Sequence, residues 1–415
     1  MNTNIIKKLF PFFKNNGTTT YLDSAATTHK PQVVLDALLD FYSFNYASIQ
    51  RGLYPHAEHA TELYESARAD VASFINAATP EEIVFTSGAT ASINFIASSW
   101  ALQNLTIGDE ILVTTAEHHA NLIPWQRVCQ KTGASLRHIR INPNTLQVNL
   151  TDCVVSERTK LLAVTLDSNV LNNIWGVNKE YLTPLITKIK AQNGFVLLDA
   201  AQAVAHEALD VQKLNADFVA FSGHKLFGPT GVGVLYINRA LHNSVEPYQV
   251  GGGMVHTVTE QNASWARAPH KFEAGTPPIA QVIGLHKAID FISSTINYTD
   301  LAAHETALCS QLVKGLDAIK QITLVANREA LAKKGHLVSF FVKNVHGHDL
   351  ASYLGAYGIA IRAGNHCAQP LLTQLNTPAL LRVSISSYNT TEDIDTLLKT
   401  LEQGIVKLTI EATHG

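Results

Sequence analysis

Three side chains in this sequence could do chemistry together: Lys225, Asp199 and Cys367. Lys225 ends the run "DFVAFSGHK", and a Gly/Pro loop follows it. Such a lysine is usually a solvated charge, but the flanking glycines allow a ligand to approach the backbone closely. Asp199 ends the apolar part of "GFVLLDAAQ", where a carboxylate is costly to bury unless it meets a cation. An aspartate opposite a pyridinium nitrogen, with a lysine available for a Schiff base, is how pyridoxal phosphate is held.

Other residues fit the same cofactor. The turn "SGAT" (87–90) lies between an expected strand and an expected helix, where backbone N–H groups favour a phosphate. His118 could cap a helix or stack as a flat ring on a flat cofactor. Asn169 and Gln202 could hydrogen-bond a phenolic oxygen, or they could be ordinary turn or cap residues.

Cys367 lies in "RAGNHCAQP" and has three interpretations. A lone cysteine is most often buried and inert. A zinc site needs more ligands than "NHC" offers. His366 and Arg362, close in sequence, favour a thiolate nucleophile. Arg382, in "LLRVSIS", is either an edge-strand arginine that faces solvent or a fork for a carboxylate.

These residues need a frame that brings them together. Seven short apolar runs between residues 81 and 237 show little alternation, as expected for strands covered on both faces. The intervals are long enough for crossover helices, which predicts an α/β fold with a mostly parallel sheet. Ligands of such sheets bind beyond the carboxyl ends of the strands. The polar tails of the runs, which carry most of the candidate residues, fall there.

The pattern changes after about residue 280, where strands mix with helices in a smaller α+β domain. We predict an N-terminal segment (1–30) that packs with the small domain, a large domain (31–280) and a small domain (281–415) that carries Cys367. The stretch from the Gly-rich "VGGGMVHTV" to "FEAGTPP" is predicted to be a long loop region.

Composition narrows the function classes. The chain has 415 residues, 31 basic against 34 acidic, and a net charge of −3, which argues against nucleic-acid binding. Apolar runs fall far short of the roughly 20 residues that span a bilayer, and the start has no signal-peptide core. Four scattered cysteines favour free thiols in a reducing cytoplasm.

The order of the motifs resembles the class V aminotransferase-fold cysteine desulfurases, and within them the Suf/Csd branch. The resemblance spans residues 20–400 and rests mainly on "FSGHKLFGPTGVGVLY" and "RAGNHCAQP", with "YLDSAATTHKP", "AEHHANLIPWQ", "DAAQAV" and "FEAGTP" in the same order. It implies fold type I of the enzymes that use pyridoxal phosphate. It also implies a homodimer that passes sulfur from L-cysteine to a small acceptor protein of the SufE/CsdE or SufU type.

The resemblance also implies roles for single residues. Lys225 would form the Schiff base, Asp199 would pair with the pyridinium nitrogen, and His118 would stack on the ring and exchange protons. Cys367 would accept the sulfur, and Arg382 with Arg362 and Asn169 would bind the substrate. The remaining implied cofactor contacts are to the phenolic oxygen, from Asn169 and Gln202, and to the phosphate, from Ala89, Thr90, Ser222, His224 and, across the dimer, Thr276.

The sequence departs from the family pattern in four features. Ala91 replaces a usual glutamate, and Gln50 and Tyr54 replace two histidines. An insertion in "LDSNVLNNIWG" leaves Asn173 as a second candidate for the ring asparagine.

The implied reaction yields L-alanine and an enzyme persulfide for iron–sulfur cluster or other thio-cofactor assembly. Selenocysteine lyase or cysteine sulfinate desulfinase activity remains open. So do another reaction of the same fold (aminotransferase, epimerase or C–S lyase) and a non-catalytic paralogue.

Overall fold

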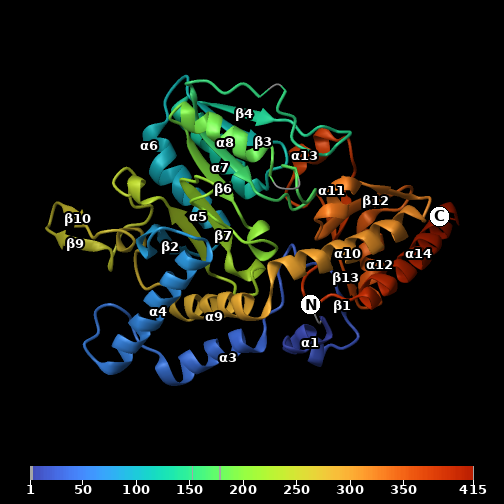
Figure 1. The fold of residues 1–415 in the computed structure, drawn as a ribbon, viewed down its shortest axis with the longest axis horizontal. Helices are drawn as coiled ribbons and strands as arrows, with labels where there is room; N and C mark the ends of the chain where they lie inside the picture. The colour runs from blue at the N-terminus through green and yellow to red at the C-terminus, as the bar shows by residue number, and fades with distance from the viewer. Residues whose placement is uncertain (1–2, 152, 177–178, 415) are drawn as a thin grey trace.

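The large part of the molecule is built on a seven-stranded sheet. The computed structural model describes residues 3–151, 153–176 and 179–414 (Figure 1). The sheet has the order β2-β8-β7-β6-β5-β3-β4. Neighbours from β7 to β4 pair in parallel, whereas β8 is antiparallel to both β7 and β2. The predicted α/β class with a mostly parallel sheet is therefore confirmed. The strands are β2 (Ile83–Thr86), β3 (Glu110–Thr114), β4 (Ser135–Ile139), β5 (Thr159–Thr165), β6 (Phe195–Asp199), β7 (Phe218–Ser222) and β8 (Gly233–Ile237).

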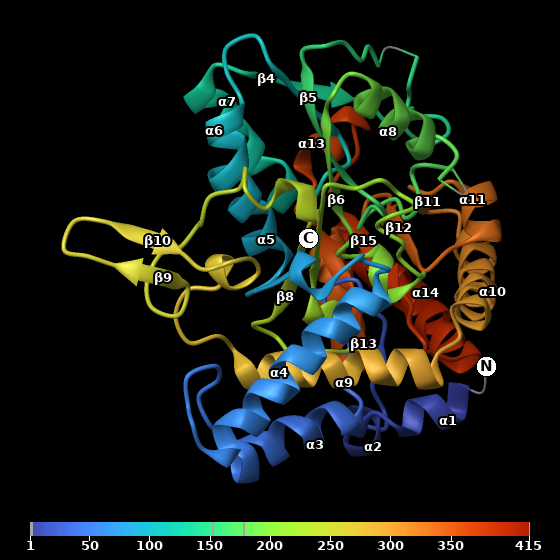
Figure 2. The ribbon, with the colours of Figure 1, turned by 60° about the vertical axis from the view of Figure 1, so that its left-hand side comes forward.

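Alternate residues of each central strand enter two separate cores. In β5, Leu161 and Ala163 pack in one core with Trp125, while Leu162 and Val164 pack in the other with Ile283. Both faces are thus apolar, which explains why the strand sequences do not alternate. The first core is covered by α5 (Ala89–Ile96), α6 (Leu102–Asn104) and α7 (Ile123–Thr132). The second is covered by α3 (Gln32–Asp40), α4 (Pro55–Phe74), α8 (Leu182–Ala191) and α9 (Ile279–Thr295) (Figure 2).

A second sheet with its own core forms the C-terminal part of the molecule. Its four strands have the order β11-β12-β15-β14 and pair antiparallel. The strands are β11 (Ile322–Leu324), β12 (Leu337–Val342), β14 (Arg362–Gly364) and β15 (Leu380–Ser384). The helices of this part are α10 (Tyr298–Asp317), α11 (Arg328–Lys333), α12 (Gly347–Ala356), α13 (Gln369–Gln374) and α14 (Thr391–His414).

The N-terminal segment runs back to this second sheet. It contains α1 (Thr3–Lys8), α2 (Pro11–Asn15) and β1 (Thr20–Tyr21), which pairs in parallel with β13 (Ile359–Ala360). A β-bridge then joins Asp23 to Ser384. These contacts put residues 20–21 beside β13 and residues 22–23 beside β15. The division of the chain at residues 30 and 280 stays a prediction.

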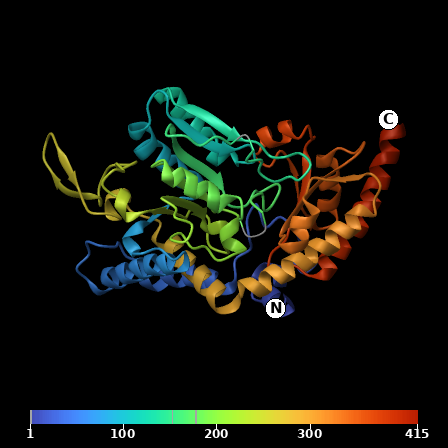
Figure 3. The same cartoon turned by 45° about the horizontal axis from the view of Figure 1, so that its top comes forward.

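The segment before α9, which was predicted to be a long loop region, contains a hairpin. Its strands are β9 (Val255–Val258) and β10 (Ala263–Trp265), and it projects from the body (Figure 3). Its side chains are mostly exposed, so it lacks the apolar run by which the other strands were predicted. In the described chain no helix is both long and apolar enough to cross a membrane.

Candidate functional site

A cavity of about 280 Å³ lies where the carboxyl ends of β5, β6 and β7 face the second sheet. Its walls include all but one of the residues predicted for the site: Ala89, Thr90, His118, Asn169, Asp199, Gln202, Ser222, His224, Lys225, Arg362, Cys367 and Arg382. These residues come from both sheets. The cavity is therefore assembled by tertiary packing from segments far apart in the sequence.

Lys225 and Asp199 reach the cavity from neighbouring strands. Lys225 ends a 3₁₀ turn, Gly223–Lys225, that directly follows β7, and Asp199 is the last residue of β6. Burial lowers the pKa of the Lys225 ammonium to about 8, although Asp199 opposes this shift. Burial likewise raises the pKa of Asp199, whose Oδ1 accepts a hydrogen bond from the Ala201 N–H at 2.9 Å. A cation at Asp199 would favour its ionised form, as a pyridinium nitrogen does.

His118 both caps a turn and lines the cavity. It precedes the 3₁₀ turn His119–Asn121, and its Nδ1 accepts a hydrogen bond from the Ala120 N–H at 3.1 Å. Burial and the neighbouring Lys225 lower the pKa of His118 to about 4. The ring is therefore neutral near pH 7 and carries its proton on Nε2, since Nδ1 is an acceptor.

Glu117 lies beneath His118 and was not singled out from the sequence. Its Oε1 lies 2.6 Å from the Thr114 hydroxyl, and its Oε2 accepts hydrogen bonds from Asn121 Nδ2 (2.7 Å) and the Thr165 N–H (2.9 Å). Burial raises the pKa of Glu117 to about 8. Asn121 in turn accepts a hydrogen bond from the Trp125 indole at 2.9 Å. This network fixes the turn that presents His118.

The residues predicted for the phosphate meet at the start of α5. Gly88 has φ 154°, which a side chain rarely allows, and a Cβ there would lie 3.3 Å from Ser222 Oγ. The Ala89 N–H donates to Ser222 Oγ at 2.8 Å. His224 Nδ1 lies 3.1 Å from Thr27 Oγ1, and burial lowers the pKa of His224 to about 4. A helix start with hydroxyl and imidazole donors fits a phosphate group.

The two candidate ring asparagines differ in position. Asn169 lines the cavity and donates from Nδ2 to the His366 carbonyl at 2.7 Å. Asn173 turns into its own loop, where it donates to the Gly176 carbonyl at 2.6 Å and accepts from the Trp175 N–H at 3.0 Å. The geometry therefore favours Asn169. Gln202 also lines the cavity, and its Nε2 donates to the Ala25 carbonyl at 2.9 Å.

Cys367 is exposed on a strained link between β14 and α13. His366 and Cys367 have φ 49° and 54°, a conformation that costs a non-glycine residue on the order of 1–3 kcal/mol. Two hydrogen bonds from the large part hold the link: Asn169 Nδ2 to the His366 carbonyl, and the His119 N–H to the Cys367 carbonyl at 2.8 Å. This strain agrees with the predicted presentation of the thiol.

His366 differs from the expectation that it would favour a thiolate at Cys367. Burial and the charge of Arg382 lower the pKa of His366 to about 3, so its ring is neutral near pH 7. The cations that interact electrostatically with Cys367 are Arg362 and Lys225. The other three cysteines are free and less accessible, and burial raises the pKa of Cys129, Cys153 and Cys309.

Arg382 lies on an inner strand, and its side chain is only 3% exposed. This excludes the alternative of an edge-strand arginine in solvent. Its Nη1 donates to the Asn169 carbonyl at 2.9 Å and its Nη2 to Asp23 Oδ1 at 3.1 Å. Asp23 also binds Arg362, which donates from Nη2 at 3.0 Å. Asp23 was missed as a site residue, although it stands in the motif "YLDSAATTHKP" that carries the resemblance.

The same N-terminal motif fixes the lysine turn. The His224 carbonyl accepts hydrogen bonds from the Thr28 N–H and hydroxyl, both at 3.1 Å, and from Lys30 Nζ at 3.0 Å. The Thr28 hydroxyl also accepts from the Phe227 N–H at 2.9 Å. Residues 27–30 therefore hold the backbone on either side of Lys225.

Thr276 does not line the cavity. It is exposed beside a second hollow of about 440 Å³, which Ala91 also lines. The predicted contact of Thr276 was to the phosphate of a partner subunit, and its place outside this chain's own cavity is compatible with that. Of the other departures, Gln50 lies against His270 (Nε2 to Nδ1, 3.1 Å), and Tyr54 is 48% exposed.

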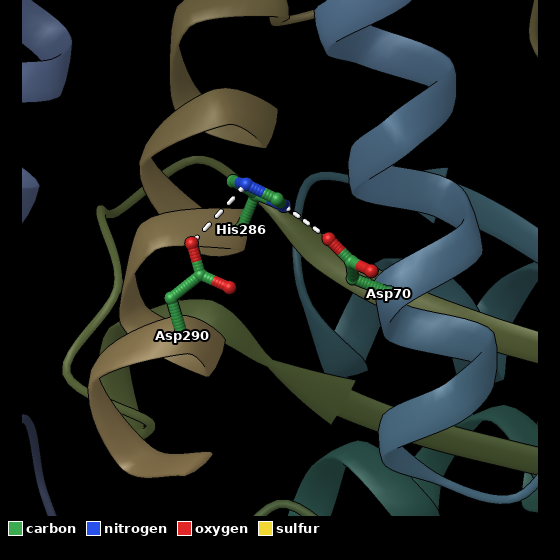
Figure 4. A group of neighbouring side chains, drawn as sticks. All are labelled: Asp70, His286 and Asp290. Carbon is green, nitrogen blue, oxygen red and sulfur yellow. Dashed lines mark ion pairs between the residues drawn. The ribbon is translucent and has the colours of Figure 1, made fainter. Parts of the chain in front are cut away.

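One group among the described residues has the donor types of a metal site: Asp70 on α4 with His286 and Asp290 on α9 (Figure 4). His286 Nδ1 lies 2.8 Å from Asp70, and its Nε2 lies 3.3 Å from Asp290. The Lys287 ammonium lies 2.9 Å from Asp290 and 3.1 Å from His286 Nε2, so a cation is already present there. The group is therefore an ion-paired contact between α4 and α9.

Comparison with known proteins agrees with the fold and the candidate site. The family model described as aminotransferase class-V matches residues 20–397. The chain therefore belongs to the class-V aminotransferase family. A cysteine desulfurase of Escherichia coli O7:K1 is 41% identical over 385 residues, which are 92% of each chain. This match places the chain among the cysteine desulfurases of that family.

Solved structures give the same result. The cysteine desulfurase CsdA of Escherichia coli has a TM-score of 0.89 at 36% identity and is matched over 98% of this chain and 99% of its own. The cysteine desulfurase of Thermococcus onnurineus NA1 has a TM-score of 0.90 at 33% identity, over 98% of each chain. The resemblance read from the sequence motifs is therefore confirmed.

Proposed function

We propose that this chain converts L-cysteine to L-alanine with pyridoxal phosphate as its cofactor, and that Cys367 takes the sulfur. The observation that carries the proposal is one cavity shared by Lys225, Asp199, Arg382 and Cys367. Each is a residue type that one part of this reaction requires: a Schiff-base amine, a partner for the ring nitrogen, a carboxylate fork and a thiol.

The residues present fit the cofactor. Ala89, Thr90, Ser222 and His224 would hold its phosphate, and Asp199 its ring nitrogen. His118 would lie against the ring, with Asn169 and Gln202 toward its phenolic oxygen. When bound, pyridoxal phosphate supplies an electron-withdrawing ring that stabilises the negative charge left at the substrate Cα.

Lys225 is suited to move the Cα proton. A pKa near 8 leaves part of the free amine unprotonated near neutral pH, as a general base requires. His118, neutral and with its proton on Nε2, can donate that proton at the ring face. Arg382, buried and held by Asp23 and Asn169, would orient the substrate carboxylate.

Sulfur transfer then completes the reaction. The thiolate of Cys367 attacks the substrate Sγ, an S–S bond forms, and the substrate Cβ–Sγ bond breaks. The electron pair of that bond stays with the three-carbon fragment, which takes up protons and leaves as L-alanine. The net change is L-cysteine plus the Cys367 thiol giving L-alanine plus a Cys367 persulfide.

A sulfur acceptor needs access to Cys367. A groove of about 740 Å³ begins beside the nucleophile, between α7 and α13. Its lining residues include His119, Ile123, Arg140 and Gln369. The His119 N–H donates a hydrogen bond to the Cys367 carbonyl. We place a small acceptor protein of the SufE/CsdE or SufU type there. Free thiols and the absence of a nucleic-acid or membrane signature in the sequence support a cytoplasmic enzyme.

We also propose a homodimer. Thr276 lies in an exposed segment beside a hollow outside the cavity of its own chain, so a phosphate contact requires a second subunit. Analytical ultracentrifugation should give a dimer, and a fully active monomer at assay concentration would contradict the role of Thr276.

The test of the function is an assay of L-alanine and protein-bound persulfide with L-cysteine, with and without a small acceptor protein. We expect equal amounts of alanine and transferred sulfur. Lys225→Ala should lose both turnover and the cofactor's lysine-linked absorbance. Cys367→Ala should lose sulfur transfer to a thiol while selenocysteine cleavage can persist. Turnover by Lys225→Ala would refute the lysine assignment, and colourless protein that refuses added pyridoxal phosphate would refute the whole proposal.

A further inference from the structure

Asn169 contacts both the link that carries Cys367 and the arginine expected to bind the substrate. Its Nδ2 donates to the His366 carbonyl at 2.7 Å, and its own main-chain carbonyl accepts from Arg382 Nη1 at 2.9 Å. Because a carbonyl can only accept, the first bond fixes which way the amide points. The side chain makes no other hydrogen bond among the described residues, so the second Nδ2 hydrogen and Oδ1 are left for a ligand in the cavity.

The loop around Asn169 is a rigid base for these contacts. Main-chain hydrogen bonds join Ser168 and Asn172 in both directions, at 2.8 and 3.0 Å. Strand β12 of the second sheet holds the loop from outside, where Ser339 Oγ donates to the Val170 carbonyl at 2.7 Å. The loop is therefore held by bonds that do not depend on the link, and Asn169 serves the link as a fixed point.

The link needs a fixed point because its backbone is strained. His366 and Cys367 both have positive φ, and the two together cost more free energy than a single hydrogen bond returns. The Asn169 amide holds the His366 carbonyl. The His119 N–H holds the Cys367 carbonyl, and this main-chain bond survives a change of side chain. The bond from Asn169 does not, so its side chain decides whether the link keeps this form.

We propose that Asn169 is a positioning residue for the nucleophile: its amide holds the carbonyl before Cys367 and keeps the link in the form that brings the thiol to the cavity. The inference rests on the proposed function and adds to it a role beyond the predicted contacts of Asn169 with cofactor and substrate. Asn169 is buried, so water does not readily replace the lost hydrogen bond. Without the amide, the link relaxes and the thiol moves away from the substrate sulfur.

The first test is hydrogen–deuterium exchange of the holoenzyme, followed by mass spectrometry on the peptide that contains Cys367. The Ala368 N–H donates to the Asn365 carbonyl at 2.9 Å across the two strained residues, so its exchange reports whether the link keeps its form. Asn169→Leu keeps the volume of the side chain and removes the donor. It should speed this exchange at least about tenfold, which corresponds to about 1.4 kcal/mol, the order of one hydrogen bond. Asn169→Ala should act in the same way, and it decides if the leucine variant does not fold.

Gln202→Leu is the matched control. Gln202 is also a buried amide that lines the cavity and is predicted to face the phenolic oxygen, but its Nε2 donates to the Ala25 carbonyl and not to the link. This variant should leave exchange in the Cys367 peptide unchanged. Unchanged exchange in both Asn169 variants, or an equal acceleration in Gln202→Leu, would overturn the inference.

A kinetic comparison separates the nucleophile from the cofactor. The first rate is that at which L-alanine exchanges its Cα hydrogen with D2O, which requires Lys225 and the cofactor but no thiol. The second is the rate at which L-cysteine forms a persulfide on Cys367. Asn169→Leu should lower the second rate at least about tenfold more than the first, because a small displacement of the reacting atoms is costly. Gln202→Leu should lower both rates by the same factor.

Equal losses of both rates in Asn169→Leu would overturn the inference, because the amide would then act on the cofactor alone. Original protein that forms no persulfide from L-cysteine would refute the proposed function. The exchange of the Cys367 peptide would still decide whether Asn169 holds the link, so the two failures are distinguishable.

Discussion

Replacing Glu117 by glutamine tests the electrostatics beneath His118. Glu117 is buried, and its pKa is raised from 4.5 to about 8, so the folded protein holds it protonated near pH 7 while the unfolded chain does not. The proton can sit on Oε1 and point to the Thr114 oxygen, because Oε2 already accepts from Asn121 and the Thr165 N–H. Glutamine reproduces this pattern, with an N–H in place of the O–H.

The magnitude follows from the linkage between proton binding and folding. Between pH 4.5 and pH 8 the folded state binds one more proton at this site than the unfolded state, so the site lowers the free energy of unfolding as pH rises. Each pH unit in that range costs about 1.4 kcal/mol, which gives about 3 kcal/mol at pH 7. Glu117→Gln removes this loss. Relative to the original protein, the variant should therefore gain stability from pH 4.5 to pH 7.

The assay is urea unfolding of both proteins at pH 4.5 and pH 7 and at equal cofactor occupancy, followed by tryptophan fluorescence. Glu402→Gln is the control, because that side chain is exposed on α14. Its difference from the original protein should not change with pH. If Glu117→Gln were less stable at pH 7 than at pH 4.5, relative to the original protein, the carboxylate would be ionised in the folded state and the reasoning would fail.

Two further predictions concern buried arginines. Arg68 is 1% exposed and donates to both oxygens of Glu273 at 2.8 and 2.9 Å, so Glu273→Ala should lower the free energy of unfolding by about 3–5 kcal/mol in urea titration. The exposed pair broken by Asp317→Ala should cost under about 1 kcal/mol, and equal losses would contradict the account. Arg382→Lys should raise KM for L-cysteine at least about tenfold with a smaller change in kcat, because an ammonium cannot reproduce the planar fork. An unchanged KM in steady-state kinetics would remove Arg382 from substrate binding.

The sequence was sufficient for the central sheet and for the core of the site. Strands β5, β6 and β7 are buried on both faces, so their apolar runs could be recognised as strands from the sequence alone. Asp199 ends β6 and Lys225 ends the short turn after the neighbouring strand β7, and the rule that ligands bind at carboxyl ends was enough to bring them together.

Other features depend on tertiary packing and could not be read from the sequence. Asp23 meets Arg382 only because the N-terminal segment runs beside β15, more than 350 residues later in the chain. The neutral state of His366 follows from its burial beside Arg382, which proximity to Cys367 in sequence did not reveal. The choice between Asn169 and Asn173 required the course of the 167–176 loop.

The central claim is that Cys367, and no other thiol, receives the sulfur. The most direct measurement is peptide mass spectrometry after a brief reaction with L-cysteine in the absence of reductant and acceptor. The account predicts one added sulfur atom on the peptide that contains Cys367, in step with the first equivalent of L-alanine. Alanine formed while Cys367 stays unmodified, or sulfur found on Cys129 or Cys153 in its place, would contradict it.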